Sequence, residues 1–277
     1  MKKLLALLLI FALVFTLAAC GGGNNAPDPE EVALEAYADI LQRLSFEDGE
    51  NGAYDIDFTI EMDMSFMGED VTSVSTGNIR MIIDGETVEM FMLMEMDMSE
   101  MGAPNSIMEM YMLVEGDQLV DMSVVVDGMD LSDMLPEDML EDMFGDVMDD
   151  TVSVPDFEDE ALEWVEINEI DGNTEIRMLL DGDSLGAFVA ESMEAQLADL
   201  AEMDGLELVY GFEDVLIVIL LDSEDNPLSM TMEMDMNIVF HTDDPMLAEL
   251  DGEEMSMRTV SIFTFNGFGD SVQIERV

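Results

Sequence analysis

The sequence predicts an α+β domain in which a meander of antiparallel strands carries two or three helices on one face. Along much of the chain, apolar residues alternate with acidic or polar ones at every second position, which is the period of a strand with one buried face. Three shorter segments, at about 29–45, 136–149 and 185–203, place apolar residues at helical spacing instead.

The first twenty residues have the form of an export signal. Two lysines precede an apolar stretch, residues 4–16, that is too short to span a bilayer. Ala18 and Ala19 then precede Cys20, the only cysteine of the chain. This order resembles the lipobox of bacterial lipoproteins, in which the cysteine receives a diacylglycerol thioether and its new amino terminus is acylated, for example with palmitate. Residues 1–20 are therefore expected to be a lipoprotein signal peptide; the alternatives are a plain secretory signal or a buried helix.

The charge of the chain excludes several classes of partner. The sequence has 66 acidic and 7 basic residues, a formal net charge of −59, and removal of the signal peptide would leave five arginines and no lysine. Such a surface repels nucleic-acid phosphates and anionic lipid headgroups. We therefore expect no nucleic-acid partner, and membrane attachment through the acyl chains on Cys20 alone. A saline habitat and a lineage-wide bias in composition explain the acidity equally well.

After the signal, residues 21–27 (GGGNNAP) are expected to form a flexible tether, and residues 28–277 a single ectodomain. Its first helix is predicted to begin with Asp28 as N-cap and Pro29 at the first helical position, and to end near Ser45. A helical insertion is expected around 130–150, and a further helix at about 185–203. Strands are predicted within 53–127 and at 164–170, 174–180, 206–221, 228–241 and 255–265.

Methionines dominate one face of the predicted sheet. The chain has 30 of them, and many recur at alternate positions within strands. Methionine is unbranched and adaptable, and is common on surfaces that accommodate varied apolar partners. The candidate ligand-binding residues are Met62, Met64, Met90, Met92, Met94, Met96, Met108, Met110, Met112, Met230, Met232, Met234 and Met236.

Two other roles for these methionines stay open. In the first, they fill a packed core with no cavity, because they share parity with residues such as Ile60, Phe66 and Ile238. In the second, their thioethers bind Cu(I), a soft ion. A flat row of sulfurs does not converge on one ion, however, and His241 is the only histidine available to complete a site. We therefore expect no metal and no cofactor.

The enzyme motifs are incomplete. Gly182-Asp183-Ser184-Leu185-Gly186 matches G-x-S-x-G and the GDSL of one esterase family. That family places an acid three residues before its histidine, and none precedes His241 at that spacing. The same segment resembles part of a calcium loop but has Ser192 where the bidentate glutamate is required. We expect Ser184 to be a helix N-cap and the protein not to be an enzyme.

The order of the predicted elements resembles that of a known superfamily. A lipobox, a helix, a long meander of Glu-Met-Asp-Met strands, a helical interruption and further strands with the turn from Leu221 to Leu228 follow one another. This order resembles the LolA/LolB and LppX/LprG-like bacterial lipoproteins, particularly uncharacterised Met-rich ones of Gram-positive bacteria. The resemblance implies a strongly curved antiparallel half-barrel whose helices cover the concave face, and a cavity for acyl chains. It transfers no residue except Cys20.

The expected function is that of a lipid-anchored, extracellular protein that binds an apolar or lipidic ligand in a methionine-lined cavity. It would be exported, held to the outer face of the cell membrane by lipid, and monomeric. The alternative is a structural or cation-interacting surface lipoprotein with a filled core, and the remote alternative is a Cu(I)-binding protein.

The lipid anchor gives the first testable prediction. Cys20→Ser should abolish lipidation, because the thioether needs the cysteine sulfur, and should leave the protein unprocessed or released. Metabolic labelling with a fatty-acid analogue measures this directly. Label retained by the Cys20→Ser protein would contradict the lipoprotein assignment.

Overall fold

A twelve-stranded antiparallel sheet with one helix makes up the described part of this computed structural model. The structure describes residues 29–44, 51–85, 87–97, 99, 104–116, 118–131, 162–182, 206–242, 251–269 and 272–274. Cys20, the tether at 21–27, the helix predicted at 185–203 and nearly all of the insertion predicted around 130–150 lie outside these residues.

The helix α2 (Pro29–Leu44) has the bounds that the sequence predicts to within one residue. Two glutamates lie in its first turn, where negative charge favours the helix dipole, and Arg43 lies in the last turn. The Arg43 Nε lies 2.8 Å from the Asp39 carboxylate one turn earlier. Ala33, Tyr37 and Ile40 are buried at helical spacing, so α2 packs through one stripe.

The first half of the sheet is the predicted meander. Its strands pair in chain order, and four of the connections between them contain a glycine in the left-handed region: Gly68, Gly85, Gly116 and Gly128. The strands are β1 (Gly52–Phe66), β2 (Glu69–Asp84), β3 (Thr87–Asp97), β4 (Ser106–Glu115), β5 (Gln118–Val126) and β6 (Met129–Asp130).

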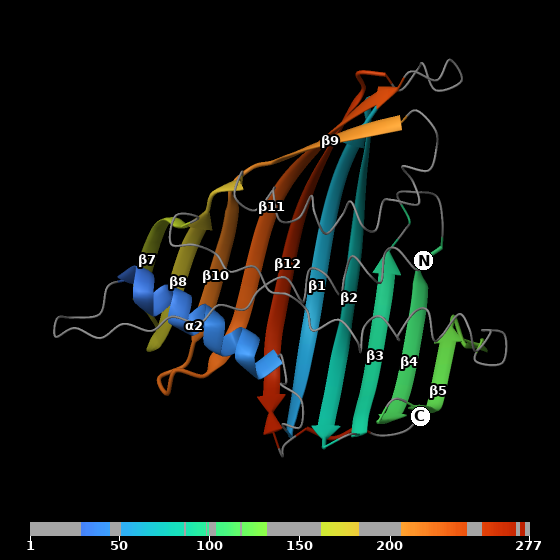
Figure 1. Cartoon of the computed structure of the whole chain (residues 1–277), viewed down its shortest axis with the longest axis vertical. Coiled ribbons are helices and arrows are strands. Elements are labelled where there is room, and N and C mark those ends of the chain that lie inside the picture. The colour runs from blue at the N-terminus through green and yellow to red at the C-terminus, as the bar shows by residue number, and fades with distance from the viewer. Residues whose placement is uncertain are drawn as a thin grey trace.

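The second half joins the first because the last strand pairs with the first one. The strand order is β6-β5-β4-β3-β2-β1-β12-β11-β10-β8-β7, and β9 pairs with β11 (Figure 1). These strands are β7 (Leu162–Ile170), β8 (Asn173–Leu180), β9 (Leu206–Phe212), β10 (Val215–Leu221), β11 (Pro227–Thr242) and β12 (Glu254–Phe268).

The predicted single strand at 206–221 is two strands in the structure. Both β9 and β10 pair with β11, but their registers differ by one residue, because Glu213 and Asp214 form a break between them. The Glu213 N–H still donates to the Asp235 carbonyl oxygen at 2.9 Å. Gly182 lies against this break, where a Cβ would clash with the Glu213 carbonyl oxygen. The break ends the pairing of β8 with β10 at Val215.

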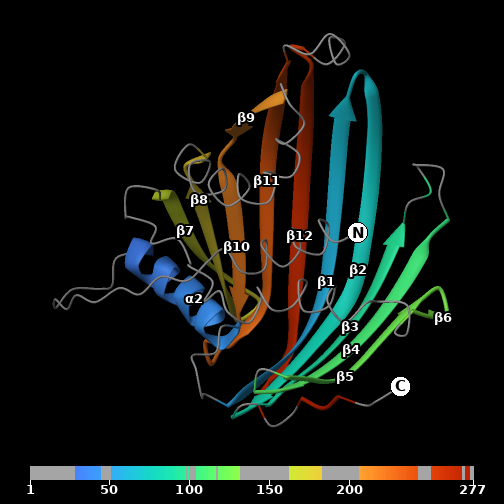
Figure 2. The same ribbon diagram turned by 45° about the vertical axis from the view of Figure 1, so that its right-hand side comes forward.

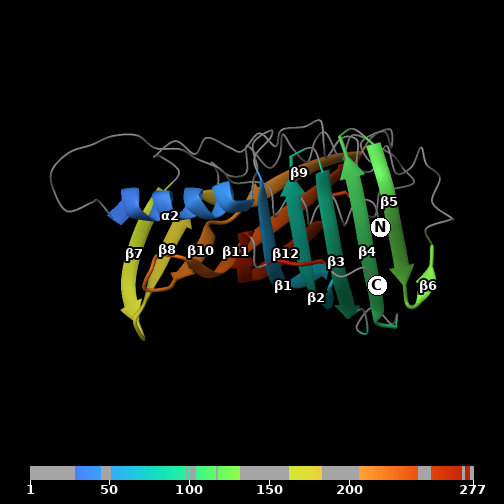
Figure 3. The ribbon, with the colours of Figure 1, turned by 90° about the horizontal axis from the view of Figure 1, so that it is seen from below.

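The sheet is curved, and α2 lies on one side of it (Figures 2 and 3). We call this side the inner face and the opposite side the outer face. The prediction of a curved antiparallel sheet is confirmed. The described residues are mainly β, with one helix instead of the two or three expected, and the other two predicted helices fall outside the described residues.

The turn between β10 and β11 is organised by one carboxylate. Asp222 accepts hydrogen bonds from the backbone N–H groups of Glu224 (2.8 Å) and Asn226 (2.9 Å), and from the Asn226 side chain (3.1 Å). Asp225 has a φ of 62°, which an aspartate tolerates in a turn. These hydrogen bonds stabilise the charged carboxylate, so the pKa of Asp222 is lowered, chiefly by the Asn226 backbone.

Removing this carboxylate should therefore destabilise the fold in a pH-dependent way. A group whose folded pKa lies below its ordinary 3.8 contributes stability above that value, and the contribution is lost as the pH falls through the lowered pKa. Asp222→Ala should lower the thermal midpoint at pH 7 more than Glu224→Ala in the same turn, and its deficit should shrink as the pH falls below about 4. Thermal melts across this range test it, and a deficit independent of pH would contradict it.

Candidate functional site

The candidate site residues lie together on the inner face. In β1, β3, β4 and β11 they occupy the alternate positions whose side chains point to the same side as the buried core. Every predicted site methionine is buried or half-buried. They are distributed over four apolar clusters that together extend from β5 to β7. The alternation in the sequence therefore locates this face correctly, but it does not reveal whether a ligand binds there.

On the β3–β4 flank, methionines face one another directly across the strands. In register, Met90 pairs with Met112, Met92 with Met110, and Met94 with Met108. Directly opposed side chains on one face lie about 4.5–5.5 Å apart at their Cβ atoms, so these thioethers are in reach of one another. All neighbours in the cluster built on the first two pairs belong, in the described residues, to β2–β5. This flank is therefore a sheet surface made largely of thioethers.

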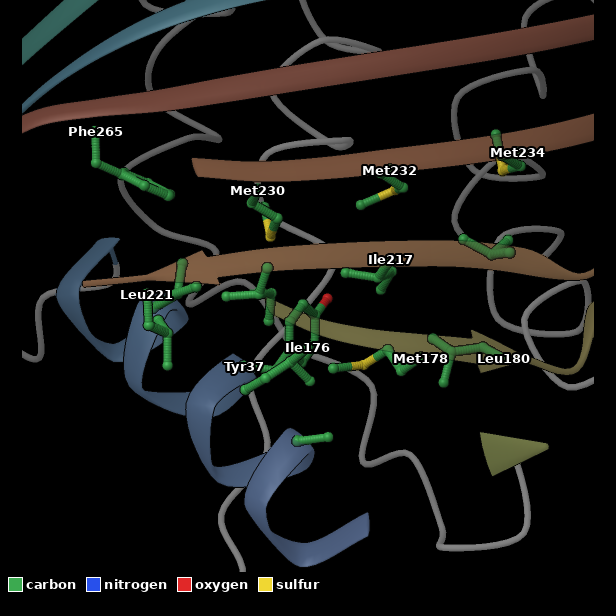
Figure 4. Close-up of a cluster of buried hydrophobic side chains, with 14 of the residues drawn as sticks. Tyr37, Ile176, Met178, Leu180, Ile217, Leu221, Met230, Met232, Met234 and Phe265 are labelled. Atoms are coloured by element: carbon green, nitrogen blue, oxygen red, sulfur yellow. The ribbon is translucent and has the colours of Figure 1, made fainter. Parts of the chain in front are cut away.

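On the opposite flank, α2 covers the sheet. Tyr37 of α2 lies over Ile176 and Met178 of β8, while Met230, Met232 and Met234 extend the same cluster along β11 (Figure 4). Burial raises the pKa of Tyr37 well above its ordinary value and that of Tyr54 to about 12. Both phenols are therefore neutral at physiological pH, so neither tyrosine adds a charge beneath α2.

Between the flanks, an aromatic ring packs directly against a glycine that has no side chain to exclude it. The side chain of Phe58, which is 4% exposed, lies over Gly77 of β2. A Cβ on Gly77 would meet the Phe58 ring at 2.6 Å and would clash with the Leu93 carbonyl oxygen. Phe58 packs in one cluster with Ile60 and Met94. The central strands are therefore closely packed at this level.

The structure adds residues to the inner face that the sequence analysis did not single out. The additional methionines are Met81, Met122, Met178, Met255 and Met257. Two buried polar side chains, Thr259 and Ser261, also lie there. Because they are polar, a search for apolar periodicity does not assign them to this face.

A hollow of about 490 Å³ lies near the ends of β1, β2, β11 and β12. Met64 and Met236 of the predicted set contribute to its wall, but so do four carboxylates and Arg258; the carboxylates are Asp63, Asp70, Glu213 and Asp235. Thr72 donates a hydrogen bond to Asp63, and Arg258 pairs with Glu233 at 3.1 Å. An acyl chain would lie against charges here, so this hollow does not suit an apolar ligand.

The only histidine does not join the methionines. His241 lies at an odd position of β11, on the opposite side from Met236 and Ile238, and its Nδ1 is 3.8 Å from the Asp251 carboxylate. The imidazole is half exposed. A copper site would therefore have thioether ligands only, which weakens the Cu(I) hypothesis.

The other motifs lie at the edge of the described chain. Ser184 is outside the described residues, whereas Gly182 donates its N–H to Asp214 at 3.4 Å. Carboxylate oxygens of Glu163, Asp181 and Asp214 lie within 4.8 Å of one another. Exposed acidic groups gather in this way without an ion in many proteins, so the cluster alone does not define a cation site.

Comparisons with known proteins find structural matches only. No protein-family model and no curated protein matches the chain. A domain named for outer membrane lipoprotein sorting, from Vibrio parahaemolyticus, is 10% identical with a TM-score of 0.23, and the alignment covers 89% of this chain and 95% of that chain. A DUF1329 family protein from Desulfovibrio piger is 8% identical with a TM-score of 0.24, and the alignment covers 90% of this chain and 96% of that chain. The first is named for the class that the sequence resembles, and at these TM-scores neither alignment bears on what this chain binds.

Proposed function

We propose that this protein is an exported lipoprotein, held to the outer face of the cell membrane through Cys20, that binds an apolar or lipidic ligand on its inner face. The observation that carries the proposal is that methionines of β3, β4 and β11, together with others of β1 and β12, are gathered on that one face. The role is one of binding without catalysis, cofactor or metal, and the protein acts as a monomer. In the described part of the chain, no helix is long and apolar enough to cross a membrane.

The chemistry of the β3–β4 flank supports an acyl ligand. Its methionines are flexible, and unbranched thioethers adapt to chains of different length and unsaturation. Each methylene group transferred from water to such a surface gains about 0.8 kcal/mol, so affinity should rise with chain length. The formal charge of −59 repels anionic headgroups from the outside of the protein.

A structural role with a filled core is the second candidate, and one observation favours it. Several of the methionines are nearly inaccessible: Met94 is 2% exposed, Met236 3% and Met232 4%. Side chains so well buried are typical of a packed interior. In that case the lipoprotein would present its acidic outer face to cations or to other surface components.

A charge placed on the inner face separates the two roles. The full chain with Cys20→Ser, which lacks its own acyl anchor, should co-purify with acyl lipid that native mass spectrometry detects. Met94→Glu and Met234→Glu should each expel this lipid, because an unpaired carboxylate facing an acyl chain must be desolvated or neutralised. If the core is filled, the same changes should unfold the domain at a cost of several kcal/mol.

Leu93→Glu is the matched control for Met94→Glu. Leu93 neighbours Met94 on β3 but points to the outer face and is 36% exposed, so its replacement should alter neither the fold nor the bound lipid. A well-folded wild-type protein that yields no lipid from several expression hosts would favour the structural role. Stoichiometric Cu(I) uptake that is lost on Met→Leu exchange would favour copper instead.

A further inference from the structure

Two polar side chains interrupt the apolar inner face at its centre. Thr259 and Ser261 of β12 are each 3% exposed. In register, Thr259 lies between Met62 of β1 and Met234 of β11. Ser261 lies in the next inner position, two residues along the strand, so the two side chains are about 7 Å apart.

The polarity of β12 is inverted at this point. Val260 and Ile262 alternate with the two hydroxyl residues and point to the outer face, where Ile262 is 40% exposed. Elsewhere on the strand the usual order holds, with Met257 and Phe265 buried inside and Arg258 exposed outside. A local reversal of the hydrophobic pattern opposes stability, and such conflicts concentrate at functional sites.

The hydroxyl of Thr259 is buried without compensation. Its Oγ1 is shielded from solvent and has no hydrogen-bond partner among the described residues. Buried polar groups in folded proteins nearly always have a partner, and one without calls for a water or a ligand. Two half-buried serines of β2 continue the polar band on the other side of β1, because Ser73 is opposite Met62 and Ser75 is opposite Ile60.

The charges around this band favour a neutral ligand group. The described arginines lie elsewhere: Arg80 is 3.4 Å from Asp55, and Arg258 pairs with Glu233, both on the outer face. Arg43 pairs with Asp39 on α2, and Arg177 alternates with the buried Ile176 and Met178, so it also points outward. No described cation therefore faces the band to balance a carboxylate or a phosphate. A hydroxyl donor is suited instead to an uncharged acceptor such as an ester carbonyl.

We propose that Thr259, assisted by Ser261, binds the ester carbonyl oxygen of a neutral acyl ester such as a diacylglycerol. The Thr259 hydroxyl donates and the carbonyl oxygen accepts, while the acyl chains lie along the methionines on either side. Met62 and Met234 flank Thr259, and the ligand would reach its hydroxyl by a change of rotamer in these unbranched side chains. This assignment rests on the proposed function and specifies its ligand as an ester lipid, as opposed to a free fatty acid or a hydrocarbon.

The test compares an ester with an ether. Dioleoylglycerol and its dialkyl ether analogue, which lacks the carbonyl groups, each displace a fluorescent hydrocarbon from the full chain carrying Cys20→Ser. The protein with Thr259 unchanged should bind the ester about tenfold more tightly than the ether. A tenfold difference in Kd corresponds to the free energy of about one buried hydrogen bond. Thr259→Val keeps the shape of the side chain and should reduce ester binding to the ether level without changing the Kd of the ether.

Thr264→Val provides the matched control, because Thr264 is an exposed outer-face residue of the same strand. It should keep the tenfold preference. Equal Kd values for ester and ether in the unsubstituted site would overturn the assignment while leaving the proposed function intact, and this comparison needs no variant to fold. Tighter binding of oleate than of dioleoylglycerol would overturn it as well. Failure to bind either glycerolipid or the fluorescent hydrocarbon would instead contradict the proposed function.

Discussion

The alternation of methionine with acidic or polar residues along the strands is the constraint from which the architecture follows. With a period of two, a strand such as β11 or β3 places its thioethers on one side and its carboxylates on the other. Antiparallel pairing in register then joins these sides into an apolar inner face and an acidic outer face. A slip by one residue would bury several carboxylates at once, so the register is strongly specified. The position of α2 follows too, because its stripe of Ala33, Tyr37 and Ile40 needs an apolar surface to cover.

The outer face carries many carboxylates and few cations. Neutral side chains therefore stabilise some of these carboxylates by donating hydrogen bonds to them. The Asn78 amide donates to Asp55 at 2.6 Å and to Asp57 at 2.9 Å. Arg80 serves twice, since it lies near Asp55 and its guanidinium is 5.8 Å from the centre of the Phe91 ring. Repulsion between carboxylates that are exposed to solvent falls as the ionic strength rises. With a formal net charge of −59, we therefore expect the stability of this protein to depend on salt more than that of a charge-balanced domain.

Local signals predicted most of the elements, because helices and half-buried strands each have a period that a sequence displays. Pro29 and the stripe through Ile40 give α2, and the glycine turns divide the meander. The pairing of β1 with β12 joins two segments that lie far apart in the sequence, and it has no local signal. The sequence does not reveal the break at Glu213–Asp214, because β10 is an unbroken apolar run without a period.

The candidate site was predictable in outline only. The methionine pattern gave the inner face, whereas Thr259 and Ser261 lie on it against the pattern, since Val260 and Ile262 are the apolar residues of that stretch. A sequence search for apolar periodicity assigns such residues to the wrong face. Register with Met62 and Met234 is what places them inside. The residues proposed to select the ligand are therefore those that the sequence alone could not locate.

The central claim, that the inner face receives an acyl ligand, is tested most directly by methionine methyl NMR with a spin-labelled acyl ester. The methionines of the protein serve as the probes, because Met92, Met110 and Met232 lie on the inner face. Met67 and Met129, which are 54% and 62% exposed at turns, serve as controls. The methyl signals of the first three, assigned by single Met→Leu variants, should lose intensity when the labelled ester is added, and those of Met67 and Met129 should persist. Loss confined to Met67 and Met129 would mean that the ester only adsorbs to the surface, and would contradict the claim.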